Sequence, residues 1–419
     1  MVVIIVLYNI LSKGDPMFFN KDKKEIFKYL KKEAKRQKSE INLIASENFV
    51  SDDVLKACGH PIQNKYAEGY SGKRYYMGCE YVDKIEDKCK ELVCELFHAK
   101  YANVQAHSGS SANLAVYMAC CKYWSLKPNE IIGIGFDLAS GGHLTHFNSP
   151  TISGQLFNSK TYGLDKAGNI DYKTIEDLLK QYKDKHIILS LGYSAYSHKI
   201  DYKRLSNFIK KNHIKCFIVH DISHIAGLVV TGLYPNPLDY NWGESVSIIT
   251  STTHKTLRCA RHAIIATNFE PLAKKINQAV FPYLQGGPLE NMIAGVAMGL
   301  SEAKTKKFKK YQEQILKNVQ AMIKGISEAN KDIKFVGNGS DNHLCLVDLR
   351  DTNISGKEAE LLLKDNNIVC NRNTIPGDSP SNPNGIRLGS AFMTSRGWKE
   401  KQFYKIGLKI GKILLKVEK

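Results

Sequence analysis

Short apolar runs alternate with amphipathic segments through the middle of the chain. The runs that predict strands, because they are rich in β-branched residues, are residues 130–137, 186–194, 214–221 and 245–251. Between them, residues 172–183 and 202–212 carry apolar side chains at helical spacing and predict helices. This alternation predicts an α/β fold built on a mostly parallel, doubly wound sheet.

The pattern changes beyond about Ala303. A long amphipathic helix is followed by a strand at residues 343–350, a helix at 355–365, a strand at 367–370 and a terminal helix. We therefore expect a second, smaller α+β domain at the C-terminus. The predicted organisation is an N-terminal arm over residues 1–50, a large domain over 51–302 and the small domain over 303–419.

Polar residues follow the apolar runs, where ligands bind in doubly wound sheets. Ser194, Asp221 and Lys255 each come at or just after such a run. Burial and the nearby cations Arg258 and Arg261 would lower the pKa of Lys255, so that its amine could hold an aldehyde as a Schiff base. The alternative is an ordinary solvated lysine.

Asp221 closes the apolar run "FIVHD", where an uncompensated carboxylate would be costly. A protonated pyridine nitrogen is one cationic partner that would satisfy it, and the carboxylate would keep such a ring able to accept electrons. The alternative is that Asp221 caps the following turn or pairs with His224.

Two further motifs suit a flat, phosphorylated cofactor. "QAHSGSSANLAVYMA" places Ser108, Gly109 and Ser110 at the start of a helical pattern, which suits a phosphate or else an ordinary N-cap. In "SGGHLTH", His143 follows two glycines and could lie against a heterocycle or else belong to the core. With Lys255 and Asp221, these motifs together describe pyridoxal 5'-phosphate.

Longer motifs carry a resemblance to a known family. They are "INLIASENF", "NKYAEGYSGKRYYMGCEYVD", "SGGHLTH", "SAYS", "DISHIAGL", "TSTTHKTLR", "FPYLQGGPL", "DNHLCLVDL" and "GIRLGS". In this order they resemble serine hydroxymethyltransferase, over about residues 41–397. The resemblance implies the pyridoxal-phosphate-dependent transferase fold (fold type I), with a seven-stranded sheet in the large domain.

The resemblance also implies roles for individual residues. It makes Lys255 the lysine that binds the cofactor covalently, Asp221 the partner of its ring nitrogen and His143 the imidazole stacked on its ring. The other implied cofactor-binding residues are Ser108, Gly109, Ser110, Ser194, His224, Arg261, Gly286 and Gly287, the last two from the neighbouring subunit. The implied catalytic residues are Lys255, Glu68, His143, Asp221 and His254.

Substrate residues are implied in the same way. Arg387 would bind the carboxylate of the amino acid with help from Ser46, and Tyr66, Glu68 and Tyr76 would line the same site. The implied folate-binding residues are Leu138, Gly142, Leu144 and Asn373, and no metal is implied. The implied reaction moves the hydroxymethyl carbon of serine to tetrahydrofolate, giving glycine and 5,10-methylenetetrahydrofolate, in a homodimer or tetramer with shared active sites.

Several residues depart from the family pattern. Cys259, Ala260, His262 and Ala263 stand where the family has Gly, Pro, Gly and Gly, and such glycines permit backbone angles that a histidine resists. The other departures are Phe147 for glycine, Ser71 for proline, Asn291 for histidine and residues 390–392 for Thr-Pro-Ala.

Composition leaves two alternatives open. The net charge of +18 could attract RNA, so the first alternative is a catalytically weak paralogue that binds RNA or partners an active subunit. Lysines spread along solvated helices explain the same charge. The second alternative is a folate-independent aldolase acting on threonine or allo-threonine.

The 10 cysteines lack paired spacing, which favours a reducing compartment over a disulfide framework or structural zinc. No apolar run approaches the roughly 20 residues of a membrane span. The leader "MVVIIVLY" at Met1 to Tyr8 lacks the features of a secretory signal or an ordinary transit peptide. We expect the cytoplasm or the mitochondrial matrix.

Overall fold

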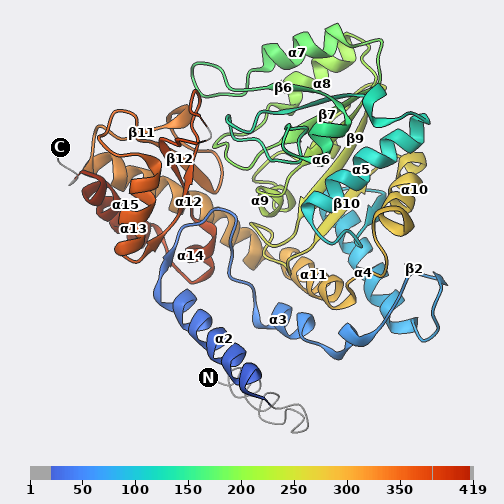
Figure 1. The fold of residues 1–419 in the computed structure, drawn as a ribbon, viewed down its shortest axis with the longest axis horizontal. Helices are drawn as coiled ribbons and strands as arrows, with labels where there is room; N and C mark the ends of the chain where they lie inside the picture. The colour runs from blue at the N-terminus through green and yellow to red at the C-terminus, as the bar shows by residue number, and fades with distance from the viewer. Residues whose placement is uncertain (1–19, 380, 416–419) are drawn as a thin grey trace.

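A seven-stranded mixed sheet forms the centre of the larger lobe (Figure 1). The computed structural model describes residues 20–379 and 381–415. In sheet order the strands are β4 (Tyr101–Asn103), β10 (Ala263–Thr267), β9 (Val246–Thr252), β8 (Cys216–Asp221), β7 (Ile187–Gly192), β5 (Ile132–Phe136) and β6 (Asn158–Tyr162). Only β10 is antiparallel to its neighbours, so the predicted mostly parallel sheet is confirmed.

The sheet is buried on both faces because alternate strand residues enter two separate cores. Ile187, Leu189 and Leu191 join the core that contains side chains of α4 (Glu80–Phe97), α7 (Tyr172–Gln181) and α8 (Tyr202–Lys211). Ile188 points the other way, into the core with α5 (Gly109–Trp124) and α10 (Glu270–Gln278). Burial on both faces explains why the strands read as continuous apolar runs.

One departure from the family pattern is built into this second core. Phe147, where a glycine was expected, adopts a left-handed φ of 60° and is 1% exposed. Its ring packs 4.5 Å from that of Tyr117 and 5.4 Å from that of Phe157, centroid to centroid. Gly133 on β5 leaves the space for the ring, since a Cβ there would lie 2.5 Å from a Phe147 ring carbon.

Replacing Gly133 with alanine should therefore destabilise the protein by about 1–3 kcal/mol through overpacking. Urea unfolding followed by circular dichroism measures this change. Gly59→Ala is the matched control, because a Cβ there would only approach a carbonyl oxygen at 3.6 Å. Equal stability of the two variants would contradict the described packing of Phe147.

The smaller lobe contains a four-stranded antiparallel sheet. Its strands are, in order, β11 (Lys334–Phe335), β12 (Leu344–Asp348), β15 (Gly385–Gly389) and β14 (Asn371–Asn373). The helices α12 (Lys306–Ala329), α13 (Gly356–Asp365) and α15 (Glu400–Leu415) pack around it, and their apolar faces share one core with β12 and β15. The helix and strand pattern expected after Ala303 is present.

The last predicted strand does not join this sheet. Residues 367–370 supply β13 (Ile368–Val369), which pairs in parallel with β1 (Ile41–Asn42) near the N-terminus. The Leu43 amide also donates to the Val369 carbonyl at 2.8 Å, and the Gly389 amide donates to the Leu43 carbonyl at 2.7 Å. Backbone hydrogen bonds therefore attach the segment around residues 41–43 to the C-terminal lobe.

Helix α2 (Lys21–Ser39) extends away from both lobes and has no buried residue (Figure 1). The remaining elements are α3 (Asp52–Cys58), β2 (Gly69–Tyr70), β3 (Lys73–Arg74), α6 (Ile152–Leu156), α9 (Ala226–Val230), α11 (Glu290–Ala303) and α14 (Ala391–Ser395), with short 3-10 and π turns. The domain boundaries at residues 50 and 302 stay a prediction, and the leader at residues 1–8 lies outside the described residues.

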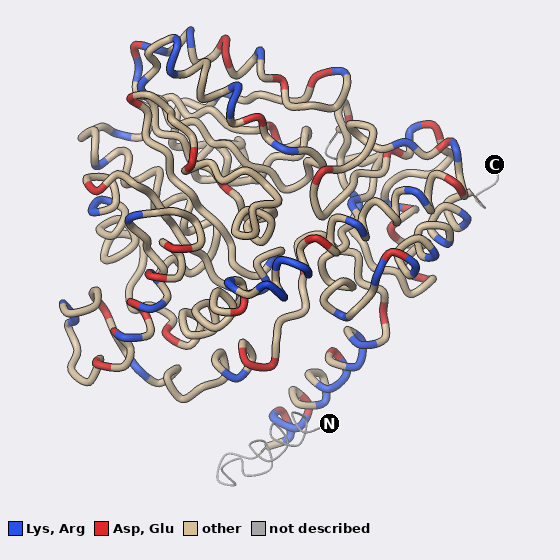
Figure 2. The backbone as a smooth tube through the Cα atoms, turned by 180° about the vertical axis from the view of Figure 1, so that it is seen from behind, with Lys and Arg blue, Asp and Glu red and all other residues tan. Residues whose placement is uncertain are grey.

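Basic and acidic residues are interleaved over both lobes (Figure 2). Helix α2 shows the densest run of basic residues in this view. A search of the described residues finds no helix that combines the length and apolar character needed to cross a bilayer.

Candidate functional site

The polar residues predicted at the strand ends converge on one cavity of about 390 Å³. Asp221 is the last residue of β8, and Ser194 and Lys255 lie in the loops that follow β7 and β9. Because these strands are parallel neighbours, their carboxyl ends meet at one edge of the sheet. The predicted residues that line the cavity are Ser46, Ser108, Gly109, Ser110, His143, Ser194, Asp221, His254, Lys255 and Arg261.

Lys255 has the environment of a reactive amine. Its side chain is only 9% exposed, and burial lowers its pKa to about 8. Asp221 opposes this change, whereas the positive charges of Arg387 and Arg261 add to it. The Lys255 carbonyl accepts a hydrogen bond from Asn48 Nδ2 at 2.8 Å, which fixes the loop. A substantial share of the amine is therefore neutral near pH 7 to 8.

Asp221 is held by four donors. Its carboxylate accepts from the Ser223 amide and hydroxyl, from Asn113 Nδ2 at 2.9 Å and from His146 Nε2 at 3.1 Å. Burial by itself raises the pKa of Asp221, but the hydrogen bond from His146 and the charges of nearby groups, Lys255 among them, together outweigh burial and hold the pKa well below its ordinary range. The carboxylate stays ionised, as a partner for a cationic ring nitrogen requires.

The proposed pairing of Asp221 with His224 is wrong. His224 Nδ1 lies 3.2 Å from His343 Nε2, and the two rings stack with centroids 5.3 Å apart. His224 is buried and does not line the cavity among the described residues. The other alternative for Asp221 is correct, because its carboxylate does cap the turn at Ser223.

The segment around Ser108 has the N-cap role that was one of its two predicted alternatives, and its geometry also suits a phosphate. Ser108 is the N-cap of α5 and accepts a hydrogen bond from the Ser111 amide at 3.2 Å. Gly109 and Ser110 form the first turn, where free amides and the helix dipole favour an anion. A Cβ at Gly109 would lie 2.6 Å from Thr252 Cγ2, so only glycine allows this close approach.

A second cavity of about 370 Å³ adjoins the first, and both are lined by His143 and Ser194. It contains all four predicted folate-binding residues, Leu138, Gly142, Leu144 and Asn373. His143 lies at the junction, with Nδ1 2.7 Å from the Thr145 hydroxyl, and burial lowers its pKa to about 4. The imidazole is therefore neutral near pH 7, which suits stacking on a flat ring.

Arg387, on β15, reaches the same region from the small lobe. Its Nη1 donates to the Ser194 carbonyl at 2.5 Å and its Nε donates to Asn371 Oδ1 at 3.2 Å. Burial lowers the pKa of Arg387 to about 10, so it remains charged near pH 7. Ser46 follows the segment at residues 41–43, which is hydrogen-bonded to the small lobe, and lines the cavity from that side.

Besides His224 and Arg387, five predicted cofactor- and substrate-binding residues do not line the Lys255 cavity of their own chain. Tyr66 and Tyr76 pack with ring centroids 5.0 Å apart and are 55% and 44% exposed. A Cβ at Gly286 would lie 3.3 Å from Glu68 Oε1, and a Cβ at Gly287 would lie 3.3 Å from the Tyr66 ring. These five residues form a separate surface cluster, which we call the Glu68 cluster.

The departures in the loop after Lys255 do not fall at left-handed backbone positions. Arg258 has a φ of 63°, but none of Cys259, Ala260, His262 and Ala263 has a positive φ, so these residues do not need the backbone angles that glycine permits. The space comes from helix α11 instead. A Cβ at Gly299 would lie 2.5 Å from Cys259 Sγ, and one at Gly295 would lie 2.8 Å from the Ala260 Cβ.

His262 is also accommodated. It is fully buried, and its Nε2 donates to the Val104 carbonyl at 2.9 Å. Burial lowers its pKa to about 4, so the ring is neutral near pH 7. The side chain lines the Lys255 cavity together with Arg261.

Sequence reasoning missed several residues of the site. His146 and Asn113 hold Asp221, Asn371 holds Arg387, and Thr252 closes over Gly109. The only signal for His146 was its spacing of three residues from His143. Ligand atoms of His143, His146 and Asp221 lie within 4.8 Å of one another, a spacing that could also hold a metal ion, although the sequence predicted none.

The cavity fits pyridoxal 5'-phosphate. Four buried polar atoms in its wall, Thr252 Oγ1, His254 Nδ1, His107 Nε2 and His262 Nδ1, find no hydrogen-bond partner among the described residues. A ligand with acceptor and donor groups would satisfy them. The site combines a buried lysine, an ionised aspartate and a helix start that favours anions, at one edge of this sheet. These features define a pyridoxal-phosphate-dependent enzyme of fold type I.

Comparisons with known proteins name the family. A sequence model described as serine hydroxymethyltransferase matches residues 19–410. A serine hydroxymethyltransferase of Francisella philomiragia subsp. philomiragia is 47% identical over 380 residues, which cover 90% of this chain and 87% of that protein. Those of Francisella tularensis strains SCHU S4 and U112 are each 46% identical over 382 residues, which cover 90% of this chain and 88% of each protein.

The chain belongs to the serine hydroxymethyltransferase family. Enzymes of this family use pyridoxal 5'-phosphate as cofactor and tetrahydrofolate as co-substrate. The predicted family, fold class and cofactors are thereby confirmed. Neither the RNA-binding paralogue nor the folate-independent aldolase gains support from these comparisons.

Proposed function

We propose that this chain transfers the hydroxymethyl carbon of serine reversibly to tetrahydrofolate, giving glycine and 5,10-methylenetetrahydrofolate. One observation carries the proposal: Lys255, Asp221, His143 and the Ser108–Ser110 turn share one cavity. The adjoining cavity with Leu138, Gly142, Leu144 and Asn373 supports the proposal, because it could hold the folate beside the Lys255 cavity.

The chain's own residues would hold the cofactor. Lys255 Nζ would bind it covalently, Asp221 would keep the ring nitrogen protonated, and His143 would stack on the ring. The first turn of α5, with Ser108, Arg261 and His254, would bind the phosphate, and Ser194 would contact the phenolic oxygen. When bound, pyridoxal 5'-phosphate takes up the electrons released as a bond to the amino-acid α-carbon breaks.

Arg387 orients the amino acid. Two of its five N–H groups are committed to Ser194 and Asn371, and the remaining ones can grip a carboxylate. Ser46 adds a hydroxyl on the same side of the cavity. The fixed guanidinium would place the α-carbon of the substrate against the ring that Asp221 and His143 hold.

The Glu68 cluster supports a shared active site. Glu68, Tyr66 and Tyr76 carry the roles that the folate and the serine hydroxyl require, yet they lie on the surface and outside the Lys255 cavity of their own chain. We propose that a second copy supplies them, together with Gly286 and Gly287, in a homodimer. In that dimer the Glu68 carboxylate would move a proton at the substrate hydroxyl.

Ten free cysteines support a reducing compartment, which we propose to be the cytoplasm or the mitochondrial matrix.

The activity is tested with purified protein loaded with pyridoxal 5'-phosphate and given serine. We expect glycine and 5,10-methylenetetrahydrofolate to form at equal rates, and only when tetrahydrofolate is present. Serine cleavage that proceeds equally without folate would instead indicate an aldolase. No cleavage under either condition, in protein that retains the cofactor, would overturn the proposal.

Mixing two inactive variants tests the shared site. In a hybrid dimer of Lys255→Ala and Glu68→Gln subunits, one site combines Lys255 of one chain with Glu68 of the other and is intact. Random assembly of equal amounts should restore about one quarter of wild-type activity. Each variant alone is the control. If Glu68 serves the site of its own chain, mixing restores nothing.

A further inference from the structure

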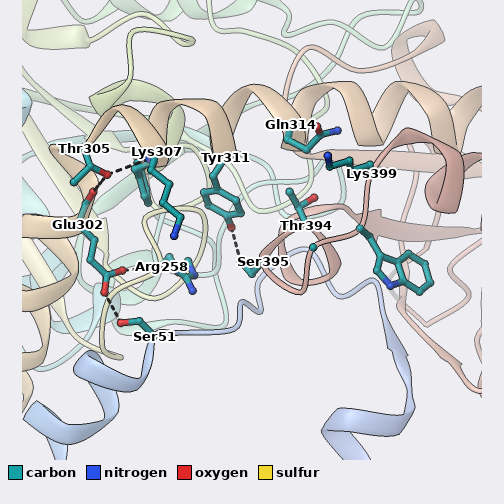
Figure 3. Close-up of a pocket in the computed structure, with 13 residues that line it drawn as sticks. Ser51, Arg258, Glu302, Thr305, Lys307, Tyr311, Gln314, Thr394, Ser395 and Lys399 are labelled. Atoms are coloured by element: carbon teal, nitrogen blue, oxygen red, sulfur yellow. Dashed lines mark hydrogen bonds and ion pairs between the residues drawn. The ribbon is translucent and has the colours of Figure 1, made fainter.

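A larger cavity, of about 560 Å³, lies apart from the site described above. It is enclosed by the start of α12, the end of α14 and the segment that leads into α15 (Figure 3). None of its lining residues also lines the Lys255 cavity or the folate cavity. Its size falls within the roughly 300–1,000 Å³ typical of small-molecule sites.

The wall of this cavity carries an excess of positive charge. It contains Arg258, Lys307 and Lys399 against a single acidic residue, Glu302. Arg258 Nη1 lies 3.3 Å from Glu302, so these two charges compensate each other. Within residues 20–379 and 381–415, the ammonium groups of Lys307 and Lys399 form neither an ion pair nor a hydrogen bond. The charge of Lys399 interacts with the neighbouring Glu400 carboxylate, whereas Lys307 has no ion pair among the described residues and favours an anionic ligand.

The two lysines lie at opposite ends of the cavity. In Figure 3 the Lys307 side chain extends toward Arg258 and Tyr311, while Lys399 and Gln314 lie at the opposite end. Lys307 belongs to the first turn of α12, a helix of 24 residues with Thr305 as its N-cap. Free amides and the dipole of this long helix add to the positive potential at the Lys307 end. A compact, doubly charged group such as a phosphate fits this end.

Aromatic side chains also line this cavity. Phe308 and Tyr311 pack with ring centroids 5.6 Å apart, and Trp398 is a further lining residue. Such surfaces bind flat rings through stacking and apolar contact. The Gln314 amide nitrogen already donates to Asn318 Oδ1 at 2.8 Å and to Glu400 Oε2 at 2.9 Å, so its carbonyl oxygen is the atom that could accept from a polar substituent of such a ring.

We propose that this cavity binds a small molecule that joins a phosphate-type dianion to a flat aromatic or heteroaromatic ring. The dianion lies at Lys307 and the first turn of α12, and the ring lies along Tyr311 and Trp398. The proposal is independent of the serine hydroxymethyltransferase activity, because it uses no residue assigned to that site.

The cavity is connected to the back of the Lys255 loop. The Tyr311 hydroxyl accepts from Ser395 Oγ at 2.8 Å and from Asn48 Nδ2 at 2.9 Å. The same Asn48 amide donates to the Lys255 carbonyl at 2.8 Å. A ligand that contacts Tyr311 would therefore be connected to the Lys255 loop through the side chains of Tyr311 and Asn48.

The test is isothermal titration of protein already loaded with pyridoxal 5'-phosphate, so that the Lys255 cavity is filled. The probes are adenosine 5'-monophosphate and phenyl phosphate, with adenosine and inorganic phosphate as separate halves. At least one aromatic phosphate should bind about tenfold more tightly than either half, because charge and ring both contribute. Binding of phenyl phosphate alone would indicate a single-ring ligand, and binding of both would admit a nucleotide.

Substitutions locate the site. Lys307→Ala should weaken binding of the aromatic phosphate at least about tenfold, since it removes a hydrogen bond between charged groups. Lys310→Ala is the matched control on the same helix, because Lys310 is also exposed but does not line the cavity. Both lysines are exposed, so neither change should alter folding.

Two results would overturn the proposal. One is inorganic phosphate binding as tightly as the aromatic phosphates, which would exclude a role for the ring. The other is equal affinity of the Lys307→Ala and Lys310→Ala variants, or no binding of any probe by the loaded protein.

Discussion

Replacing Lys255 with alanine should abolish covalent retention of pyridoxal 5'-phosphate and lower turnover on the order of 10³-fold or more. The reason is that Lys255 is the amine of this cavity, and no other lysine among the described residues lines it. Arg261 lines the cavity and Arg387 lies close enough to act on Lys255 by its charge, but neither can serve as a nucleophile, because arginine stays protonated.

Borohydride trapping followed by peptide mapping measures the covalent link. Wild-type protein should carry the reduced cofactor on the peptide with Lys255, and Lys255→Ala should carry none. The exposed Lys310→Ala is the control and should behave as wild type. Trapping on another lysine in the Lys255→Ala protein, with turnover preserved, would remove Lys255 from its assigned role.

The pKa of about 8 adds a pH dependence to this result. Only the neutral amine attacks an aldehyde, and its share rises between about pH 7 and about pH 9. Cofactor uptake by the cofactor-free protein should therefore accelerate over this range. A rate that still rises steeply near pH 10 would mean that burial does not lower the pKa of Lys255.

Replacing Asp221 with asparagine should lower turnover by about 10²–10³-fold while Lys255 still binds the cofactor. Asparagine keeps the size of the side chain but removes the negative charge that would hold the ring nitrogen protonated. It also brings an amide donor against Asn113 and His146, both of which now donate to the carboxylate. We expect a loss of stability of about 1–3 kcal/mol from this mismatch.

Turnover, borohydride trapping and urea unfolding of the same preparation separate these effects. Asp177→Asn is the control, since Asp177 is exposed and pairs only with Lys173 on the same helix. Turnover within a few-fold of wild type for Asp221→Asn would show that the carboxylate is not needed for the chemistry. Loss of covalent binding as well would instead indicate that Asp221 mainly maintains the shape of the cavity.

The parts of the site that the sequence predicted are those fixed by strand ends. Asp221 and Lys255 follow apolar runs, and neighbouring parallel strands bring such positions together whatever the loops do. Ser108 and its neighbours were predictable for a similar reason, because a helix start exposes its amides wherever it lies. Site residues whose positions depend only on where a strand ends or a helix begins can thus be predicted from the sequence.

Side-chain partners were not predictable in this way. His224 follows Asp221 closely in the sequence, yet it turns toward His343, and His146 takes the place beside the carboxylate. The same limit explains the loop after Lys255. Its bulkier residues replace glycines that permit unusual backbone angles, and Gly295 and Gly299, on a helix distant in sequence, leave the room they need. Which distant residue is small enough to make room for these side chains depends on tertiary packing, and the sequence pattern does not show it.

The pairing of β1 with β13 makes the substrate end of the cavity depend on both ends of the chain. Ser46 is placed by a segment whose hydrogen-bond partners are Val369 and Gly389, and Gly389 belongs to the same strand as Arg387. Truncations from the N-terminus and from the C-terminus should therefore converge on one defect, loss of substrate binding. The two lobes cannot be expressed as independent modules that each keep half of the site.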